Sequence, residues 1–195
     1  MITKKMHLPF SVLRWPLAVL LIALAIAGCK KDDDKTTDTP PLAASTQTWT
    51  FGDQTWSDAI QCPECNRKTF EESDTEPQCR NYADAESGKT FYYYNWPYVD
   101  ANKNTMCPSP WRVPTRKDFD ELVGTACANL LGKSWGYGGY AEGSSLSLEN
   151  SEAAYWSNTE MYGYTNDAYY MFYHRIGLGV HAKVKDVGMQ VRCVK

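Results

Sequence analysis

An apolar segment near the N-terminus determines where the rest of this chain folds. Lys4, Lys5 and Arg14 give it a positive flank, and residues 15–27 contain no charge. The segment is shorter than the roughly 20 apolar residues that a transmembrane helix needs, and its basic flank is typical of a secretory signal. The sequence therefore predicts that the chain is exported and that its later residues fold outside the cytoplasm.

The apolar segment ends in Ile26-Ala27-Gly28-Cys29. This ending resembles the lipobox of bacterial lipoproteins. The resemblance implies that residues 1–29 are a signal peptide ending at Cys29, which is lipidated and becomes the mature N-terminus. Its acyl chains would anchor the protein to a membrane, since each buried methylene contributes about 0.8 kcal/mol. The alternative is an uncleaved N-terminal anchor in which the cysteine is incidental.

Residues 30–47 are predicted to form a disordered tether. They begin with Lys30-Lys31-Asp32-Asp33-Asp34-Lys35 and continue with Thr, Pro, Ala and Ser, which bury too little apolar surface to offset the entropy of ordering. The charged cluster resembles the signal that sends Bacteroidota-type lipoproteins to the outer face of the outer membrane. We therefore expect a lipid-anchored outer-membrane protein exposed at the cell surface. If the cluster is only a solvated linker, the periplasmic face is the alternative.

Six cysteines follow the predicted lipidation site, namely Cys62, Cys65, Cys79, Cys107, Cys127 and Cys193. An even number in an oxidising compartment favours disulfides, although six cysteines allow 15 pairings. Cys62-Pro63-Glu64-Cys65 could instead begin a zinc site with Cys79 and Cys107. No second C-x-x-C follows, which favours disulfides over zinc. Cys127 is as well explained as a small buried thiol.

The charge balance argues against a nucleic-acid partner. Residues 1–29 hold three of the 20 Lys and Arg residues and none of the 23 Asp and Glu residues, so the mature chain has a formal charge of −6. A nucleic-acid surface needs a basic stripe, which this composition does not provide. Residues 48–195 have the length of one ordinary domain.

One main helix is predicted over about 115–131. Thr115 and Asp118 have the spacing of a capping box, in which each side chain bonds to the other residue's backbone N–H. Apolar residues then recur on one helical face from Phe119 to Leu131, and Gly132 supplies the stop. The fold class is therefore α+β, with one main helix, short antiparallel strands and long loops. The strands are expected at 47–51, 54–56, 90–96, 154–157, 168–174, 179–184 and 189–194, and the loops at 61–88 and 132–150.

Three stretches of the domain resemble one known family when taken in order. They are Met106-Cys-Pro-Ser-Pro-Trp-Arg-Val-Pro-Thr115 leading into Asp118-Phe119, then Tyr155-Trp-Ser-Asn-Thr-Glu160, and finally Gly188-Met-Gln-Val-Arg-Cys-Val194. This order resembles the FISUMP domain, the major paralogous domain named after Fibrobacter succinogenes, over residues 48–195. The resemblance implies a C-type-lectin-like fold whose last strand returns beside the first elements. It also implies a disulfide between Cys107 and Cys193, which would contribute about 4–5 kcal/mol on a chain-entropy estimate.

No catalytic residue is predicted. The chain has no G-x-S-x-G elbow, P-loop or zincin motif, and residues 30–195 contain only His174 and His181 as histidines. The formylglycine-generating enzymes share the fold class, but their Arg-Gly-Gly-Ser-Trp type of segment is absent here. A related oxidase activity would rest on fold analogy alone. We therefore expect a non-enzyme without a cofactor.

Loop aromatics favour an adhesin-like binding protein, because flat rings stack on sugars and binding residues concentrate in loops. The candidate ligand-binding residues are Trp135, Tyr137, Tyr140, Asn158, Glu160, Tyr162 and Tyr164. The alternative is that these rings fill a core poor in helices. The expected partner is a glycan or a surface protein; the competing function is a structural component of a surface complex or pilus tip.

Calcium is a weaker possibility at the same loops. Oxygen ligands for Ca²⁺ could come from Asn158, Glu160, Asn166 and Asp167. The Glu-Pro-Asn motif of calcium-dependent lectins is absent, and Trp156-Ser157-Asn158 matches only half of their second motif. A polar loop is the simpler explanation.

Overall fold

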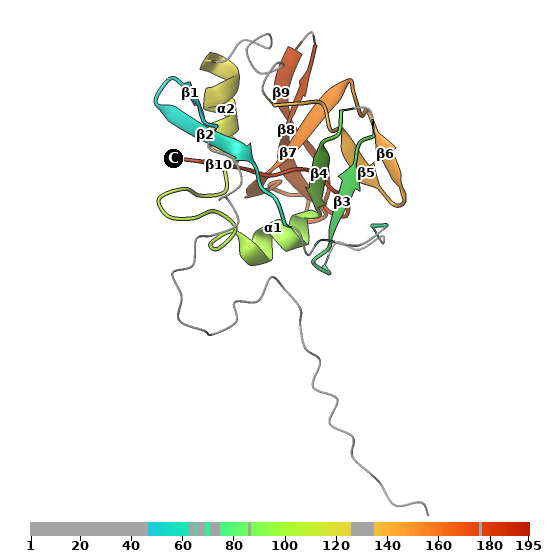
Figure 1. Cartoon of the computed structure of the whole chain (residues 1–195). Coiled ribbons are helices and arrows are strands. Elements are labelled where there is room, and N and C mark those ends of the chain that lie inside the picture. The colour runs from blue at the N-terminus through green and yellow to red at the C-terminus, as the bar shows by residue number, and fades with distance from the viewer. Residues whose placement is uncertain are drawn as a thin grey trace, which may run out of the picture. The chain divides into compact units, whose positions relative to one another are not determined.

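The computed structural model describes residues 47–62, 65, 69–70, 75–85, 87–125, 135–175 and 177–195 (Figure 1). The predicted signal peptide, the lipidation of Cys29 and the tether up to residue 46 lie outside the described residues. Cys127 and the last part of the predicted helix, residues 126–131, also lie outside them. Within the described ranges, no helix combines the length and hydropathy that crossing a membrane requires.

The described chain is an α+β domain, as predicted, with two helices and ten short strands. In chain order the elements are β1 (Trp49–Phe51), β2 (Gln54–Ala59), β3 (Cys79–Ala83), β4 (Thr90–Tyr94), α1 (Trp96–Asn102), α2 (Arg116–Thr125), β5 (Tyr140–Glu142), β6 (Ser145–Ser147), β7 (Glu152–Glu160), β8 (Asp167–His174), β9 (Gly177–Val184) and β10 (Arg192–Val194). They form four small antiparallel sheets, ordered β1-β2-β10, β3-β4, β5-β6 and β7-β8-β9.

The two ends of the described domain meet in one sheet. Strand β10 pairs with β2, beside which it lies in Figure 1, and Thr55 and Lys195 exchange two backbone hydrogen bonds of 2.9 and 3.0 Å. The disulfide between Cys107 and Cys193 joins β10 to the segment before α2 and spans 86 residues of sequence. This is the pairing that the family resemblance implies.

Strand β7 separates two parts of the core. Its central residues are buried, and neighbouring side chains along a strand point to opposite faces. Tyr155 therefore packs in one cluster, with Trp56 and Phe119, whereas Trp156 packs in the other. The Trp156 indole N–H donates to the backbone carbonyls of Tyr94 (2.9 Å) and Val187 (3.2 Å). Aromatic side chains thus fill much of the core of the described domain.

The start of α2 confirms the predicted capping box and adds an ion pair. The Thr115 hydroxyl accepts from the Asp118 N–H (3.3 Å), and the Asp118 carboxylate accepts from the Thr115 N–H (2.7 Å). The Arg112 guanidinium donates two further bonds, of 2.6 and 2.7 Å, to the same carboxylate. Burial alone would raise the pKa of Asp118, but the hydrogen bonds from Arg112 and Thr115 outweigh it and hold this pKa below its ordinary value.

The sequence predicts the longer helix, α2, but not the shorter helix α1, which follows directly on β4. The aromatic run 90–96 was expected to be one strand, but it ends at Tyr94. The Asn95 side chain caps the new helix by accepting from the Tyr98 N–H (3.1 Å), and Pro97 suits a first helical turn.

Two segments expected to be irregular contain strands. Strand β3 lies within the predicted loop 61–88 and pairs with β4 over five residues. Strands β5 and β6 form a hairpin within 132–150. In both cases the strand forms by pairing with a partner strand, and the sequence of one segment alone does not predict that partner.

Replacing Asp118 by Asn tests the electrostatic origin of the α2 cap. The variant should lower the free energy of unfolding at pH 7 by about 1–3 kcal/mol, because it removes charge-assisted hydrogen bonds. The folded-state pKa is depressed, so this contribution is complete above about pH 4 and is lost as the pH falls through the folded pKa. Urea unfolding from pH 7 to pH 2 should therefore show the two proteins converging. Asp120→Asn, on the exposed side of α2, is the control and should cost less than about 0.5 kcal/mol; a gap that persists at pH 2 contradicts the account.

Candidate functional site

The structure brings four of the predicted ligand residues to the β7–β8 connection. Asn158 and Glu160 end β7, and Tyr162 and Tyr164 lie in the turn that follows. Three backbone hydrogen bonds of 3.0–3.1 Å order this turn: Met161 N–H to Asp167, Tyr164 N–H to Met161, and Asp167 N–H to Tyr164. Gly163 adopts a φ of 81°, a conformation that residues with a Cβ atom rarely adopt. These hydrogen bonds give the turn a defined backbone conformation.

The two tyrosines of this turn are exposed. Tyr162 is 96% and Tyr164 is 62% exposed, whereas most of the aromatic rings in the described chain are buried or half-buried. A tyrosine ring offers a large apolar face together with a hydroxyl that donates and accepts hydrogen bonds. The turn therefore presents two such faces to solvent on a backbone that is already ordered.

Lys185 ties this turn to the start of α1. Its side chain is only 8% exposed, and its ammonium group contacts both the Glu160 carboxylate and the Thr165 carbonyl. The same ammonium lies 4.5 Å from the centre of the Trp96 ring, a cation–π distance. The Lys185 backbone N–H also donates to the Asn166 carbonyl (2.9 Å). One buried cation thus holds both ends of the turn.

This ammonium bears on the calcium candidates. Glu160 already contacts Lys185, and Asp167 lies in β8 opposite Val184. Calcium binds through six to eight oxygens. The Lys185 ammonium already balances the charge of Glu160 and would repel a cation beside it, so a polar loop held by a lysine explains these residues better.

The other three predicted ligand residues lie in different surroundings. Trp135 is 3% exposed and packs against Trp56 and Tyr155, at ring-centre distances of 5.6 and 5.3 Å. The prediction that its ring faces a ligand is therefore wrong, because the residue belongs to the core.

Tyr137 and Tyr140 are half-buried and have partners of their own. Tyr137 stacks on Tyr173 at 5.1 Å, and their hydroxyls are 2.6 Å apart. Burial and this hydrogen bond raise the pKa of Tyr173. The Lys183 ammonium lies over the Tyr140 ring, 3.9 Å from the ring centre. Neither tyrosine offers an open ring face comparable to Tyr162.

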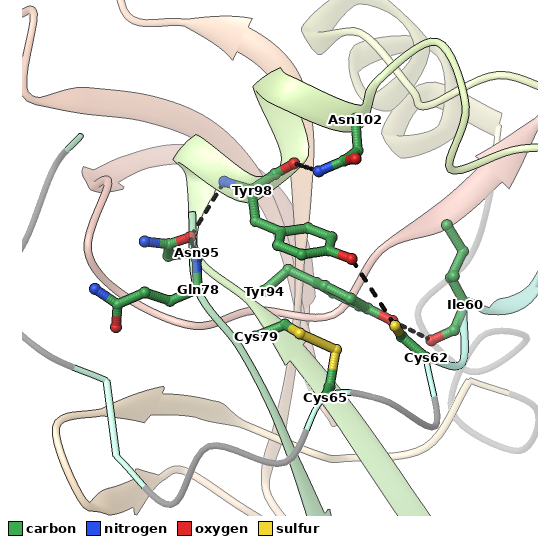
Figure 2. The surroundings of a disulfide bond; sticks show 9 residues. All are labelled: Ile60, Cys62, Cys65, Gln78, Cys79, Tyr94, Asn95, Tyr98 and Asn102. Carbon is green, nitrogen blue, oxygen red and sulfur yellow. Dashed lines mark hydrogen bonds between the residues drawn. A yellow bond between two sulfur atoms is a disulfide. The ribbon is translucent and has the colours of Figure 1, made fainter. Parts of the chain in front are cut away.

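The structure also gathers three cysteines whose pairing the sequence left open (Figure 2). Cys65 and Cys79 form a disulfide, and the sulfur atoms of Cys62, Cys65 and Cys79 lie within 4.8 Å of one another. The zinc alternative with Cys107 is contradicted, since Cys107 is bonded to Cys193. Cysteine spacing alone does not identify this cluster, because it depends on how β3 is placed.

Compared with models of protein families, with curated proteins and with solved structures, this chain matches none of them.

Replacing Lys185 by Met tests whether this residue holds the turn. The variant removes the contacts to Glu160 and Thr165, so the turn should open more often and the amides of Tyr164 and Asp167 should exchange about 10–100-fold faster. This range corresponds to the loss of about 1.4–3 kcal/mol of local stability. Hydrogen exchange followed by mass spectrometry measures it. Lys183→Met is the matched control, because Lys183 binds Glu142 (2.8 Å) rather than the turn; equal exchange in both variants would contradict the assignment.

Proposed function

We propose that this protein is a non-catalytic, adhesin-like binding protein, displayed on the bacterial outer membrane by the lipid on Cys29. Its ligand is a glycan that stacks on Tyr162 and Tyr164. The observation that carries the proposal is the exposure of both rings, 96% and 62%, on a hydrogen-bonded turn.

The order of the turn supports a binding role. Immobilising side chains and loops costs free energy on association, so a turn that is already held binds at lower cost. Lys185 and the three backbone bonds supply this order before any ligand arrives. Tyrosine adds little further cost, because its side chain has few rotatable bonds.

The chemistry around the rings fits a sugar. Stacking uses the apolar C–H face of a pyranose, and the hydroxyls at its rim need polar neighbours. Glu160 is half exposed, and Asn158 and Asn166 place amide groups at the two ends of the same turn. These groups donate and accept hydrogen bonds as sugar hydroxyls require.

Three features support placing the domain in the FISUMP family with a C-type-lectin-like fold. The last strand β10 returns beside β2, the Cys107–Cys193 disulfide closes the domain, and the α2 cap uses Thr115 and Asp118. Each lies in a stretch that carries the resemblance or in the topology that it implies.

A second candidate is a structural component of a surface assembly. Strand β9 is the outer strand of the sheet β7-β8-β9 and is eight residues long. Along the described part of the chain no further strand pairs with it, and an edge strand offers backbone groups to a partner strand. Purification of a stable complex from native envelopes would favour this candidate over glycan binding.

A glycan array probed with the full-length protein in detergent tests the proposal. The wild type should bind a defined set of glycans, and Tyr162→Ala with Tyr164→Ala should weaken binding about tenfold or more, since central aromatic contacts commonly contribute 2 kcal/mol or more. Leu148→Ala, at another exposed apolar residue, should leave binding unchanged. Repeating the array with a chelator reads out any calcium requirement. Absence of binding to every glycan, or full binding by the double variant, would refute the sugar-binding function.

A further inference from the structure

A third sulfur lies next to one of the two disulfides. Figure 2 shows Cys62 beside the Cys65–Cys79 bond, with Tyr98 above it. Cys62 carries a thiol, and its sulfur lies within 4.8 Å of the sulfur atoms of Cys65 and Cys79. A thiolate attacks a disulfide sulfur directly, so proximity of this kind is the first requirement for exchange.

The backbone also accommodates the alternative bond. The Cys65 N–H donates to the Cys62 carbonyl (2.9 Å). A backbone hydrogen bond between positions three apart keeps their Cα atoms within about 7 Å, and disulfides join Cα atoms about 4.4–6.8 Å apart. A bond between Cys62 and Cys65 therefore needs little rearrangement of the main chain.

We propose that Cys62, Cys65 and Cys79 form a thiol–disulfide exchange site, in which one disulfide moves between Cys65–Cys79 and Cys62–Cys65. Cys62 loses its proton to solvent, and its thiolate attacks the sulfur of Cys65. The Cys62–Cys65 bond forms as the Cys65–Cys79 bond breaks, and Cys79 leaves as a thiolate that takes up a proton. The step is an isomerisation without any net oxidation or reduction.

Exchange moves the thiol towards the surface. Cys62 and Cys65 are 6% and 0% exposed, whereas Cys79 is partly exposed at the start of β3. The Cys79 thiolate can then attack a small disulfide, so that a mixed disulfide forms on Cys79 and one thiolate of the small molecule is released. The ligand class of the site is thus a low-molecular-weight disulfide, which reaches a partly buried sulfur more readily than a folded protein does.

Two side chains hold the site together. The Tyr98 hydroxyl lies 3.8 Å from the Cys62 sulfur and is a donor for a thiolate there. The Asn95 side-chain oxygen accepts from the N–H of Tyr98 (3.1 Å) and from the N–H of Gln78 (2.7 Å), the residue before Cys79. The cap of α1 therefore positions both the attacking and the leaving sulfur.

Peptide mapping of the full-length protein tests the proposal. The protein is incubated without reductant between about pH 6 and pH 9, treated with an excess of dithionitrobenzoate as the small disulfide, quenched in acid, and its thiols are blocked with maleimide in denaturant. Trypsin then separates residues 36–67, with Cys62 and Cys65, from residues 69–80, with Cys79. The bond recorded in the structure gives these two peptides cross-linked, with the label on Cys62. Exchange gives an internal bond in 36–67 and, on Cys79, either a mixed disulfide with thionitrobenzoate or a maleimide adduct.

We expect the Cys79 adduct to form faster as the pH rises, because the thiolate is the attacking species. Cys62→Ser should abolish it and leave the two peptides cross-linked. The Cys107–Cys193 bond is the internal control and should stay intact, since no third cysteine of the described chain clusters with it. Labelling of Cys62 alone in the wild type at every pH would overturn the proposal even if the variant failed to fold. A Cys79 adduct that persists in a folded Cys62→Ser protein would overturn it too.

Discussion

A buried guanidinium joins β10, the last strand of the domain, to β2 in the same sheet. Arg192 is 1% exposed and donates to the carbonyls of Ser57 (2.6 Å) and Trp135 (3.3 Å), with Asp58 at 3.4 Å. Its charge lies 4.3–5.2 Å from the centres of three rings, those of Trp49, Trp135 and Tyr155. Removing such a charge from water costs several kcal/mol unless partners replace the water. Strand β10 can therefore join β2 only when these carbonyls and rings are in place, and the Cys107–Cys193 bond then holds it there.

This closure is connected to the proposed binding turn through β7. Gln190, just before β10, exchanges backbone hydrogen bonds with β7: its N–H donates to Ala154 (3.1 Å) and its carbonyl accepts from Trp156 (3.0 Å). The far end of β7 carries Glu160 and the turn with the exposed tyrosines. Lys185 braces that turn from the other side, against α1. The exposed rings thus stand on a strand that the closed core fixes, which is the order that low-cost binding requires.

Local chemistry accounts for what the sequence predicted correctly. The Thr115–Asp118 cap is encoded within a few positions, and so are the strands predicted at 154–157, 168–174 and 179–184, which lie within β7, β8 and β9. Features that depend on distant partners were missed. The sequence around Trp135 is typical of a loop, and only its contact with Arg192 assigns it to the core. The Cys65–Cys79 pairing follows from the position of β3. Helix α1 was not predicted, because the aromatic run 90–96 favours a strand and the N-cap residue Asn95 lies within that run. The turn with Tyr162 and Tyr164 was predicted to be a loop from its polar composition, whereas Lys185, which holds it, resembles an ordinary surface lysine in the sequence.

Urea unfolding of an Arg192→Met variant tests the closure most directly. The two side chains have similar length, so the variant removes the charge and its hydrogen bonds while keeping most of the packing. If the guanidinium holds β10 to β2, the free energy of unfolding should fall by about 3 kcal/mol or more, because the Ser57 carbonyl loses this donor and the Asp58 carboxylate loses its ion pair. The Trp135 carbonyl keeps its hydrogen bond from the Tyr155 hydroxyl (2.8 Å). An unchanged or higher free energy of unfolding would show that packing alone closes the domain, and would contradict the central role given to Arg192.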